Sequence, residues 1–579
     1  MSSKKSILLI VFVGILFFAN ALFNGFVYDD EGQLLKNSAV HSLANIPQLF
    51  TGSTYDPGGS TKLPGLYYKP LMPVFFTLLY SIFGPQPFWF HFFQIFLHIG
   101  NALLLNLLLV TFVSPIAALI ASLIFLLHPA NSEVAIYSAN LQDVLFVFFG
   151  LLSLHAIRIE SRLKSGGKKL ALQILIPLLL LFSLLSKETG IIFFALGFLY
   201  LFLFKRKRLL VYVLSASAAL IVYAWLRLGI AQVGIATEGV PPIMRTELGP
   251  RLLHIPFLFF LYLLLFFFPK DLAIGQQWIL SEITLTNFWL PLAIVTSFLL
   301  GLRKIYLLIR KKDRKSALEF LFFFSWFLLG ITLHLQIFPL DFTFADRWFY
   351  IPMIGLLGMG AISFSLLILP KISSSTQKDV VLLGCLVILL LLGLRTIFRN
   401  SNFKDNFSLY SHDIQITKNS YSLENSYGIE ISKKGDINEA QLHFKKSVEL
   451  APQWWTNWFN LGLSFEKQGN IKEAEKAYIA SIKNGNPYFA YEQLAKLYLL
   501  YGSKNSALAV ATDGVSLFPN NPRLFRVLAL TQYELGLSAE ATESAKRSYM
   551  LEPNPTTQNL YELLRTNHKI RLKETPEKK

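Results

Sequence analysis

The first 402 residues alternate long apolar runs with short polar segments. Twelve of these runs approach the ~20 residues that an α-helix needs to cross a bilayer. They cover residues 7–23, 88–113, 116–127, 134–157, 170–185, 191–204, 209–230, 252–268, 288–302, 318–337, 349–369 and 380–394. The pattern predicts a bundle of membrane helices. A long loop, 24–87, separates the first two runs, and its half-apolar stretch 71–83 is predicted to form a helix on the membrane surface.

Basic residues gather in four segments between the apolar runs: Lys4 with Lys5, 158–169, 205–208 and 303–315. The positive-inside rule places all four in the cytoplasm. The four basic segments lie on one side of the membrane only if one apolar run between residues 209 and 302 does not cross it. The run 252–268 follows a loop with proline and glycine, so we predict a lateral or re-entrant helix there. This gives about eleven crossings, a cytoplasmic N-terminus, and an outer location for the loop 24–87 and for the chain after Arg399.

After residue 402 the pattern changes to mixed polar helices with an internal repeat. Small residues recur at steps of 34, 33 and 34 in two series: Gly428, Gly462, Ala495 and Ala529, and Ala440, Ala474, Ala507 and Ala541. A 34-residue period with small residues at helix crossings is the tetratricopeptide pattern. We therefore predict a tetratricopeptide α-solenoid over 403–570, closed by a polar capping helix at 557–570 and followed by a charged tail, 571–579.

Composition supports an all-α membrane protein with a soluble repeat domain. Of the 579 residues, 53% are hydrophobic and 15% are charged, and the mean hydropathy is +0.47, which excludes a purely soluble protein. The net charge of +17 resides mainly in residues 1–402, which carry +14. Because this charge lies in short segments between apolar runs, no nucleic-acid partner is expected. The only cysteine, Cys385, lies in an apolar run and excludes a disulfide framework.

Ionisable residues recur at the predicted outer ends of the apolar runs. They are Asp29, Asp30 and Glu31 in the first loop, then His128 with Glu133, Lys187 with Glu188, and Asp346 with Arg347. Charged groups beside a bilayer are costly and mark functional sites. Carboxylates and cations on one membrane face suit a reaction on a phosphate-bearing lipid, because cations hold the phosphate while a carboxylate takes a proton from the attacking group.

Structural explanations for the same residues stay open at this point. The acidic pair could also form a solvated turn. Lys187 could simply extend from a helix end to water, and Arg347 could form an ion pair with Asp346. His128 precedes a proline and is placed to end a helix.

Two further histidines, His91 and His98, lie seven residues apart on one helical face, and we interpret them as packing residues rather than metal ligands. The chain has no glycine-rich loop of the nucleotide-binding kind, which favours a lipid-linked donor over a nucleotide sugar.

The order of motifs along the chain supports a family resemblance. The motifs are 26–30 with Asn37, the sequence Tyr68-Lys69-Pro70-Leu71, His91 with His98, 128–133, 187–190, 262–272, 346–352 and the C-terminal repeats. In this order the chain resembles the lipid-dependent glycosyltransferases of the GT-C class, most closely the transmembrane and tetratricopeptide-repeat containing (TMTC) O-mannosyltransferase-like group. It departs from the family at Lys69 and Asp346, where the family usually has Arg and Glu. A Gly-Arg-x-Asp-like element appears only as Asn-Leu-Gln-Asp at 140–143.

The resemblance implies an inverting transfer of a sugar from a polyprenyl-phosphate donor to a protein or glycan acceptor. It assigns catalytic roles to Asp29 and Asp30, as proton acceptor or acceptor anchor. By the same resemblance and by charge, the donor phosphate would be held by Lys187, Arg347, Lys69 and His128, with support from Glu133, Glu188, Asp346 and Tyr350. A divalent cation, Mg or Mn, held by Asp29 and Asp30 is left open.

The expected partners are the lipid bilayer, the lipid-linked donor, the acceptor, and a protein bound by the repeats. Composition suggests a bacterial inner membrane, and an endoplasmic-reticulum membrane would show the same topology. Two other functions compete with this one. A non-catalytic anchor could hold the repeats as a scaffold for an envelope complex, in which case Asp29 and Asp30 would be dispensable. A transporter would need ionisable residues at mid-membrane depth and matching broken helices.

Overall fold

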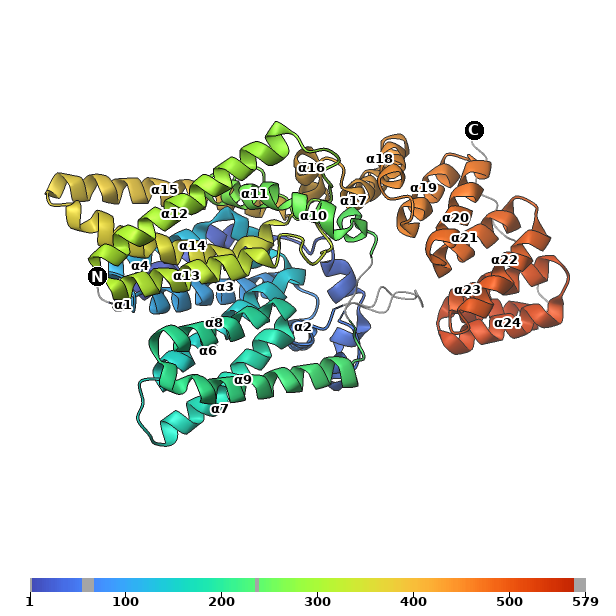
Figure 1. Ribbon diagram of the computed structural model, residues 1–579. Helices are drawn as coiled ribbons and strands as arrows, with labels where there is room; N and C mark the ends of the chain where they lie inside the picture. Colours follow the sequence, from blue (N-terminus) through green and yellow to red (C-terminus); the bar gives the residue numbers. More distant parts are fainter. Residues whose placement is uncertain (1–2, 55–66, 235–238, 567–579) are drawn as a thin grey trace. The chain divides into compact units, whose positions relative to one another are not determined.

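The computed structural model describes residues 3–54, 67–234 and 239–566. Within these ranges the regular elements are helices, apart from one isolated antiparallel bridge between Gln276 and Phe344. The chain divides into a unit that ends at Asn419 and a second unit that begins at Ser420 (Figure 1). The all-α prediction is confirmed. Part of the first loop (55–66), the last residues of the expected capping helix and the tail 571–579 lie outside the described residues.

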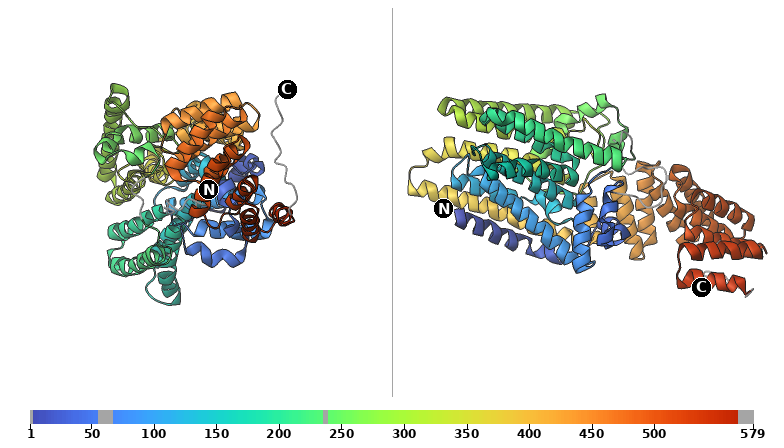
Figure 2. Two further views of the ribbon diagram at one scale, coloured as in Figure 1. Left: turned by 90° about the vertical axis from the view of Figure 1, so that its right-hand side faces the viewer. Right: turned by 90° about the horizontal axis from the view of Figure 1, so that it is seen from below.

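The first unit is a bundle whose long helices run roughly side by side (Figure 2). Its main helices are α1 (Ser3–Phe18), α3 (Pro87–Leu109), α4 (Pro115–Leu127), α6 (Leu141–Glu160), α7 (Gly167–Ser186), α8 (Ile191–Phe204), α9 (Leu209–Ala224), α12 (Leu290–Lys312), α13 (Arg314–Thr332), α14 (Tyr350–Ser363) and α15 (Ser375–Asn402). Shorter helices are α2 (Leu71–Phe83), α5 (Ser132–Ile136), α10 (Leu248–Leu253), α11 (Ile255–Phe267) and α16 (Asn406–Ile416). The surface helix expected at 71–83 is α2.

Among the described residues, ten helices are long and apolar enough to cross a membrane, or eleven if the pair Pro115–Leu127 and Pro129–Ile136, bent by 52°, counts as one span. This agrees with about eleven predicted crossings, but the two sets differ at two helices. The length criterion includes Leu248–Phe267, which was predicted not to cross. It omits the shorter apolar helix Glu188–Phe204, which was predicted to cross.

A hydrogen bond holds each end of α11. On one flank, the Leu280 N–H donates to His254 Nε2 at 2.8 Å, so the residues that follow α11 return to its start. On the other flank, the Phe266 carbonyl accepts from His128 Nε2 at 3.0 Å, at the carboxyl end of α4. That α11 does not cross stays a prediction from the basic segments.

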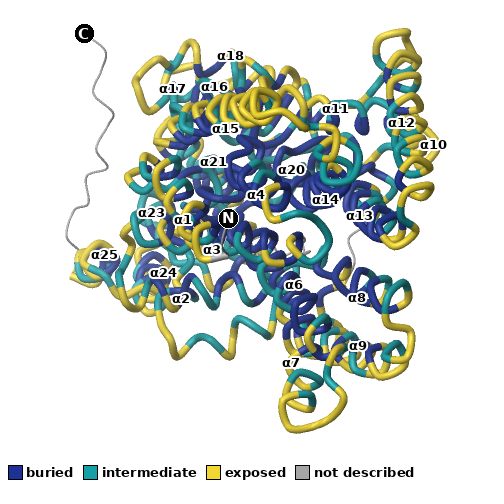
Figure 3. The backbone as a smooth tube through the Cα atoms, turned by 90° about the vertical axis from the view of Figure 1, so that its left-hand side faces the viewer, coloured by how far each residue is buried: buried dark blue, intermediate teal, exposed yellow. Residues whose placement is uncertain are grey.

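Apolar side chains face outward on the peripheral helices, as they do only where lipid replaces water. On α15, Leu383, Leu386 and Leu391 are 62%, 54% and 61% exposed, and Figure 3 shows most of this helix as exposed. Between inner helices, small residues allow close approach. A Cβ on Gly355 of α14 would lie 2.4 Å from the backbone nitrogen of Phe327 on α13, so only glycine fits at that crossing.

Residues 403–419 belong to the first unit, although the composition change at 402 assigns them to the repeat domain. The reason is a buried ion pair: Arg399 of α15 binds Asp413 of α16 at 2.7 Å, with both side chains almost fully buried. Asp413 also accepts from the Ile274 N–H at 2.9 Å. These polar contacts keep α16 in the first unit, and hydropathy alone does not reveal them.

The second unit consists of four helix pairs and a final helix. The pairs are α17 (Tyr421–Lys433) with α18 (Ile437–Leu450), α19 (Trp455–Lys467) with α20 (Ile471–Gly485), α21 (Tyr488–Leu500) with α22 (Lys504–Leu517), and α23 (Pro522–Glu534) with α24 (Ser538–Leu551). Each pair turns at a glycine with positive φ, a conformation that costs glycine little: Gly435, Gly469, Gly502 and Gly536. The repeat predicted from the small residues is thus present four times.

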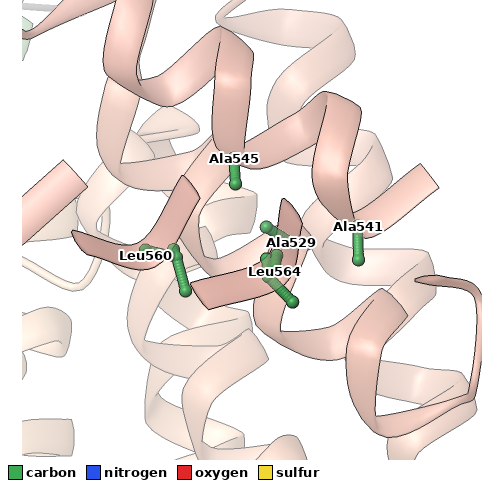
Figure 4. Packing of buried hydrophobic residues seen from close by; sticks show 5 residues of the cluster. All are labelled: Ala529, Ala541, Ala545, Leu560 and Leu564. Atoms are coloured by element: carbon green, nitrogen blue, oxygen red, sulfur yellow. The ribbon is translucent and has the colours of Figure 1, made fainter. Parts of the chain in front are cut away.

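The last helix, α25 (Pro555–Arg565), covers the end of the final repeat. Its Leu560 and Leu564 pack against Ala529, Ala541 and Ala545 (Figure 4). This is the role expected of a capping helix, which removes the apolar face of the last repeat from water.

Candidate functional site

The turn that follows α1 holds the two carboxylates in different environments. Asp30 is fully buried, and each of its oxygens accepts a backbone N–H: Val27 at 3.1 Å and Ala139 at 2.7 Å. Burial raises the pKa of Asp30 to about 8, against the opposing effect of these hydrogen bonds. Asp30 therefore closes the turn and ties it to the segment between α5 and α6.

Asp29 is only partly buried and is the more accessible of the two carboxylates. Its backbone N–H donates to the Tyr137 hydroxyl at 3.1 Å, and that hydroxyl also hydrogen-bonds the Asp29 carboxylate. Burial raises the pKa of Asp29 to about 6, while Tyr137 and the charge of Arg347 act in the opposite direction. At neutral pH Asp29 is therefore mostly ionised and can accept a proton, whereas Asp30 is mostly protonated.

Arg347 is held at the amino end of α14 by a buried ion pair with Glu133. The Arg347 guanidinium lies 2.7 Å from Glu133 Oε1, which also accepts from Asn140 Nδ2 at 2.9 Å. The same guanidinium nitrogen donates to the Ile274 carbonyl at 2.9 Å. The hydrogen bonds found for the guanidinium among the described residues use this one nitrogen, so the others are available to an anion.

Two lysines add positive charge beside this arginine. Lys187 binds Asp143 at 2.6 Å, which uses one of its three N–H groups and places Lys187 at the start of α6. Lys69 lies 4.2 Å from the centre of the Tyr67 ring and makes no ion pair within the described ranges. Burial lowers the pKa of Lys69, and the charge of Glu188 opposes this effect. An anionic ligand would offset the free energy that burial of the charged Lys69 ammonium group requires.

The electrostatics of Tyr67 show that these groups converge. The pKa of Tyr67 is raised well above its ordinary value, first by the charge of Asp341, then by burial and by Glu188. Arg347 acts on the same phenol with opposite sign, and Asp29 adds to the increase. Carboxylates and cations separated by hundreds of residues therefore share one neighbourhood at one end of the bundle.

The structure gives His128 and Tyr350 packing contacts. His128 Nε2 donates to Phe266 O, its Nδ1 accepts from the Ala130 N–H at 3.3 Å, and its ring stacks on Phe266. Neither ring nitrogen is left for a phosphate, which favours a structural role. The Tyr350 hydroxyl lies 2.9 Å from His98 Nδ1 and 3.0 Å from Asn101 Nδ2, inside the bundle. The interpretation of His98 as a packing residue agrees with these contacts.

The remaining supporting residues differ in their surroundings. Glu188 binds Arg227 at 3.1 Å and accepts from the Tyr68 N–H at 3.3 Å, so it connects the segments that follow α7 and α9 with the first loop. Asp346 is buried, and one of its oxygens has no hydrogen-bond partner among the described residues. The ion pair of Arg347 is with Glu133, not with its neighbour Asp346.

Each oxygen of Asp30 accepts one backbone N–H group, which occupies half of the acceptor capacity of this carboxylate. No three histidine, cysteine or acidic side chains of the described ranges gather in a way that could hold a metal ion. A cation held by Asp29 and Asp30 together stays a prediction.

Sequence reasoning missed several residues that build the site. Asp143 binds Lys187 and Asn140 binds Glu133, and these two residues are the ends of the 140–143 element. The similarity of this element to the Gly-Arg-x-Asp motif could therefore have indicated both contacts. Arg227 and Asp341 carried weaker signals, as single charges next to apolar runs. Tyr137 gave none, because an aromatic residue in a membrane segment is ordinary.

Comparisons with known proteins agree with this architecture. A family model for the tetratricopeptide repeat matches residues 456–484, within α19 and α20. The chain is 24% identical to human "Protein O-mannosyl-transferase TMTC3" over 99% of this chain and 67% of that protein. It is 23% identical to the mouse protein of that name (82% and 54%) and 22% identical to "Protein O-mannosyl-transferase F38B6.6" of Caenorhabditis elegans (78% and 63%). The chain spans about half to two thirds of these curated relatives, and the resemblance inferred from the motifs is confirmed.

Proteins of known structure cover a smaller share of this chain. "Crystal structure of MamA protein" is 21% identical, with a TM-score of 0.23 over 25% of this chain and 80% of that chain. A thermophilic tetratricopeptide protein of Thermus thermophilus is 15% identical, with a TM-score of 0.25 over 31% and 95%. Scores this low do not establish a shared fold for the whole chain.

Proposed function

We propose that this chain is a membrane glycosyltransferase that transfers a sugar from a polyprenyl-phosphate donor to a hydroxyl group of a protein or glycan acceptor. The observation that carries the proposal is the half-buried carboxylate of Asp29, which feels the charge of Arg347, at the same end of an apolar bundle as Lys187 and Lys69. Its homologues are named protein O-mannosyl-transferases, which supports a glycosyltransferase.

In the proposed reaction, Asp29 accepts the proton of the acceptor hydroxyl while that oxygen attacks the anomeric carbon of the donor. The bond between the anomeric carbon and the phosphate oxygen breaks, and polyprenyl phosphate leaves with the electron pair. Attack opposite to the leaving group inverts the anomeric configuration. Arg347, Lys187 and Lys69 stabilise the negative charge that develops on the phosphate. A divalent cation would need ligands from the substrate in addition to Asp29, and the reaction is written without one.

An apolar cavity supports a lipid-linked donor. It has a volume of about 420 Å³ and lies among α4, α12, α14 and α15, with Ile124, Phe298, Leu356 and Phe364 in its wall. Phe266, whose carbonyl binds His128 at the charged end of the bundle, also lines it. A hydrocarbon chain in this cavity would have its polar end near the charged groups.

The outer face is the proposed location of the charged site. The basic segments at 158–169, 205–208 and 303–315 lie at the carboxyl ends of α6, α8 and α12. Asp29 follows α1, Lys187 follows α7 and Arg347 precedes α14, so the proposed site lies at the helix ends remote from these basic segments. By the positive-inside rule the site faces the periplasm of a bacterium or the lumen of the endoplasmic reticulum. We further propose that the repeats recruit the acceptor or a partner protein there, since such repeats present concave binding surfaces.

Donor consumption tests the proposal directly. The purified full-length protein, reconstituted in nanodiscs, is incubated with a set of radiolabelled polyprenyl-phosphate sugars and an acceptor-containing membrane extract. We expect one donor to be consumed, with label transferred to protein or glycan. If a folded, inserted protein consumes none of these donors, the proposed function is wrong and the scaffold function gains support.

The pH dependence of the reaction is the second expected result. Because Asp29, with a pKa of about 6, must be ionised to act as a base, kcat/KM should rise with pH through about 6 and then level off. At about pH 5 roughly one tenth of Asp29 is ionised, so the rate should be about tenfold below the plateau. Initial rates from about pH 5 to 8 measure this. A flat profile over this range would exclude Asp29 as the base.

A further inference from the structure

The segment that follows the last membrane helix contacts the turn that carries Asp29. The Gly25 N–H donates to the Lys404 carbonyl at 2.9 Å, and the Tyr28 N–H donates to Asn406 Oδ1 at 2.7 Å. Tyr410 of α16 packs edge-on against the Tyr28 ring, with centroids 6.1 Å apart. The residue immediately before Asp29 is therefore fixed through both its backbone and its ring.

This support is needed because the turn is strained. Tyr28 has a φ of 53°, in the left-handed region that a residue with a Cβ adopts only at a cost. Such a conformation persists only where its surroundings determine it. Loss of the Asn406 hydrogen bond would remove one of the contacts that hold this conformation, and Asp29 would shift with Tyr28.

The carboxyl-terminal half of α16 reaches the arginine through one residue, Ile274. Asp413 Oδ2 accepts from the Ile274 N–H at 2.9 Å, and the Ile274 carbonyl accepts from Arg347 at 2.9 Å. Arg399 and His412 bind the other oxygen of Asp413, at 2.7 and 2.8 Å. Ile274 thus carries a connection from α16 to the guanidinium that faces the proposed phosphate.

We propose that α16 is a positioning element of the active site, in which Asn406 sets the place of the proton acceptor Asp29 and Asp413 sets the place of the phosphate-binding Arg347. The inference rests on the proposed function. Neither residue touches the substrate, so neither is catalytic. Both act on geometry, and reaction rates fall steeply when reacting groups are misplaced by about 1 Å.

The contacts of Asn406 and of Asp413 predict different kinetic effects. Asn406→Ala removes the bond to Tyr28 and disturbs the base, so kcat should fall about tenfold or more, while the KM for the donor changes little. Asn406→Asp keeps an acceptor oxygen and should restore most of the rate. The pair Arg399→Gln/Asp413→Ala removes both buried charges together and frees Ile274, so it should raise the donor KM through Arg347.

Lys404→Ala is the matched control. It lies two residues from Asn406, is exposed, and contributes its carbonyl oxygen, which the substitution retains. We expect wild-type kcat and KM. Equal losses in Lys404→Ala and Asn406→Ala would indicate a general effect on the segment and would overturn the assignment of Asn406.

Hydrogen exchange in the same nanodiscs separates this inference from the proposed function. Asn406→Ala should speed hydrogen exchange at the Tyr28 amide. The double variant Arg399→Gln/Asp413→Ala should speed hydrogen exchange at the Ile274 amide. The exchange rates of the α3 amides should not change in either variant. Unchanged exchange at both amides, or wild-type kinetics in both variants of an active enzyme, overturns the positioning role. If the wild type consumes no donor, the proposed function fails, and exchange alone decides whether α16 holds the two segments.

Discussion

Replacing Asp29 by Asn should reduce sugar transfer by about 10²- to 10⁴-fold, the range that a positioned acid–base group contributes. The amide has nearly the same shape as the carboxylate but does not accept a proton. Tyr137 can still bond to it, so the turn should remain folded. Consumption of the preferred donor, measured with equal amounts of inserted protein, gives the ratio. Turnover of Asp29→Asn at the wild-type rate would falsify the assignment of Asp29 as the base.

Its neighbours provide two controls. Glu31→Gln removes a carboxylate two residues away whose partner is the exposed Lys36, so transfer should proceed at the wild-type rate. Asp30→Asn has a different effect, because the amide presents an N–H to one of the two backbone donors that Asp30 accepts. We expect Asp30→Asn to lower thermal stability in detergent as well as activity, which distinguishes a structural carboxylate from a catalytic one.

Arg347→Gln should remove both activity and stability. It leaves Glu133 buried without its charged partner, and breaking such a pair typically costs roughly 3–5 kcal/mol. It also removes a cation that the leaving phosphate requires. Thermal unfolding in detergent and donor consumption measure the two effects separately. In any residual activity, the acid limb of the pH profile should move to higher pH, because Arg347 lowers the pKa of Asp29.

The double variant Glu133→Gln/Arg347→Gln separates structure from chemistry. It replaces the ion pair by two neutral amides of similar shape, so thermal stability should recover most of the loss. Transfer should not recover, because the guanidinium that binds the proposed phosphate is still missing. Recovery of activity together with stability would show that Arg347 serves only the fold.

The sequence predicts the fold well where one signal decides the outcome. Hydropathy locates the membrane helices, including α2, because lipid-facing residues must be apolar whatever their neighbours. The repeat series through Gly428 and Ala440 locates the solenoid equally directly, because small residues are required at each helix crossing. That 252–268 does not cross, which the positive charges indicate, stays a prediction.

The sequence predicts which membrane face the charged residues share better than it predicts which of them form ion pairs. The sequence placed Asp29, Lys187 and Arg347 at one face, but it did not show that Arg347 binds Glu133 rather than the adjacent Asp346. It also gave His128 a phosphate-binding role that its two occupied ring nitrogens do not favour. Such choices depend on which helix ends meet in space, and a single sequence contains no direct record of that. The same limit hid α16, which is linked to the bundle by the Arg399–Asp413 ion pair and by hydrogen bonds to Tyr28 and Ile274.

The single cysteine has a practical consequence. Cys385 lies on α15, partly buried beside the apolar cavity, and no other thiol exists in this chain. The protein therefore has no internal disulfide to form or to reshuffle, and its folding does not depend on the redox state of the compartment. A cysteine introduced at a water-facing position would be the reactive thiol that polar alkylating reagents reach first. Each side of the membrane can thus be mapped chemically with one substitution at a time.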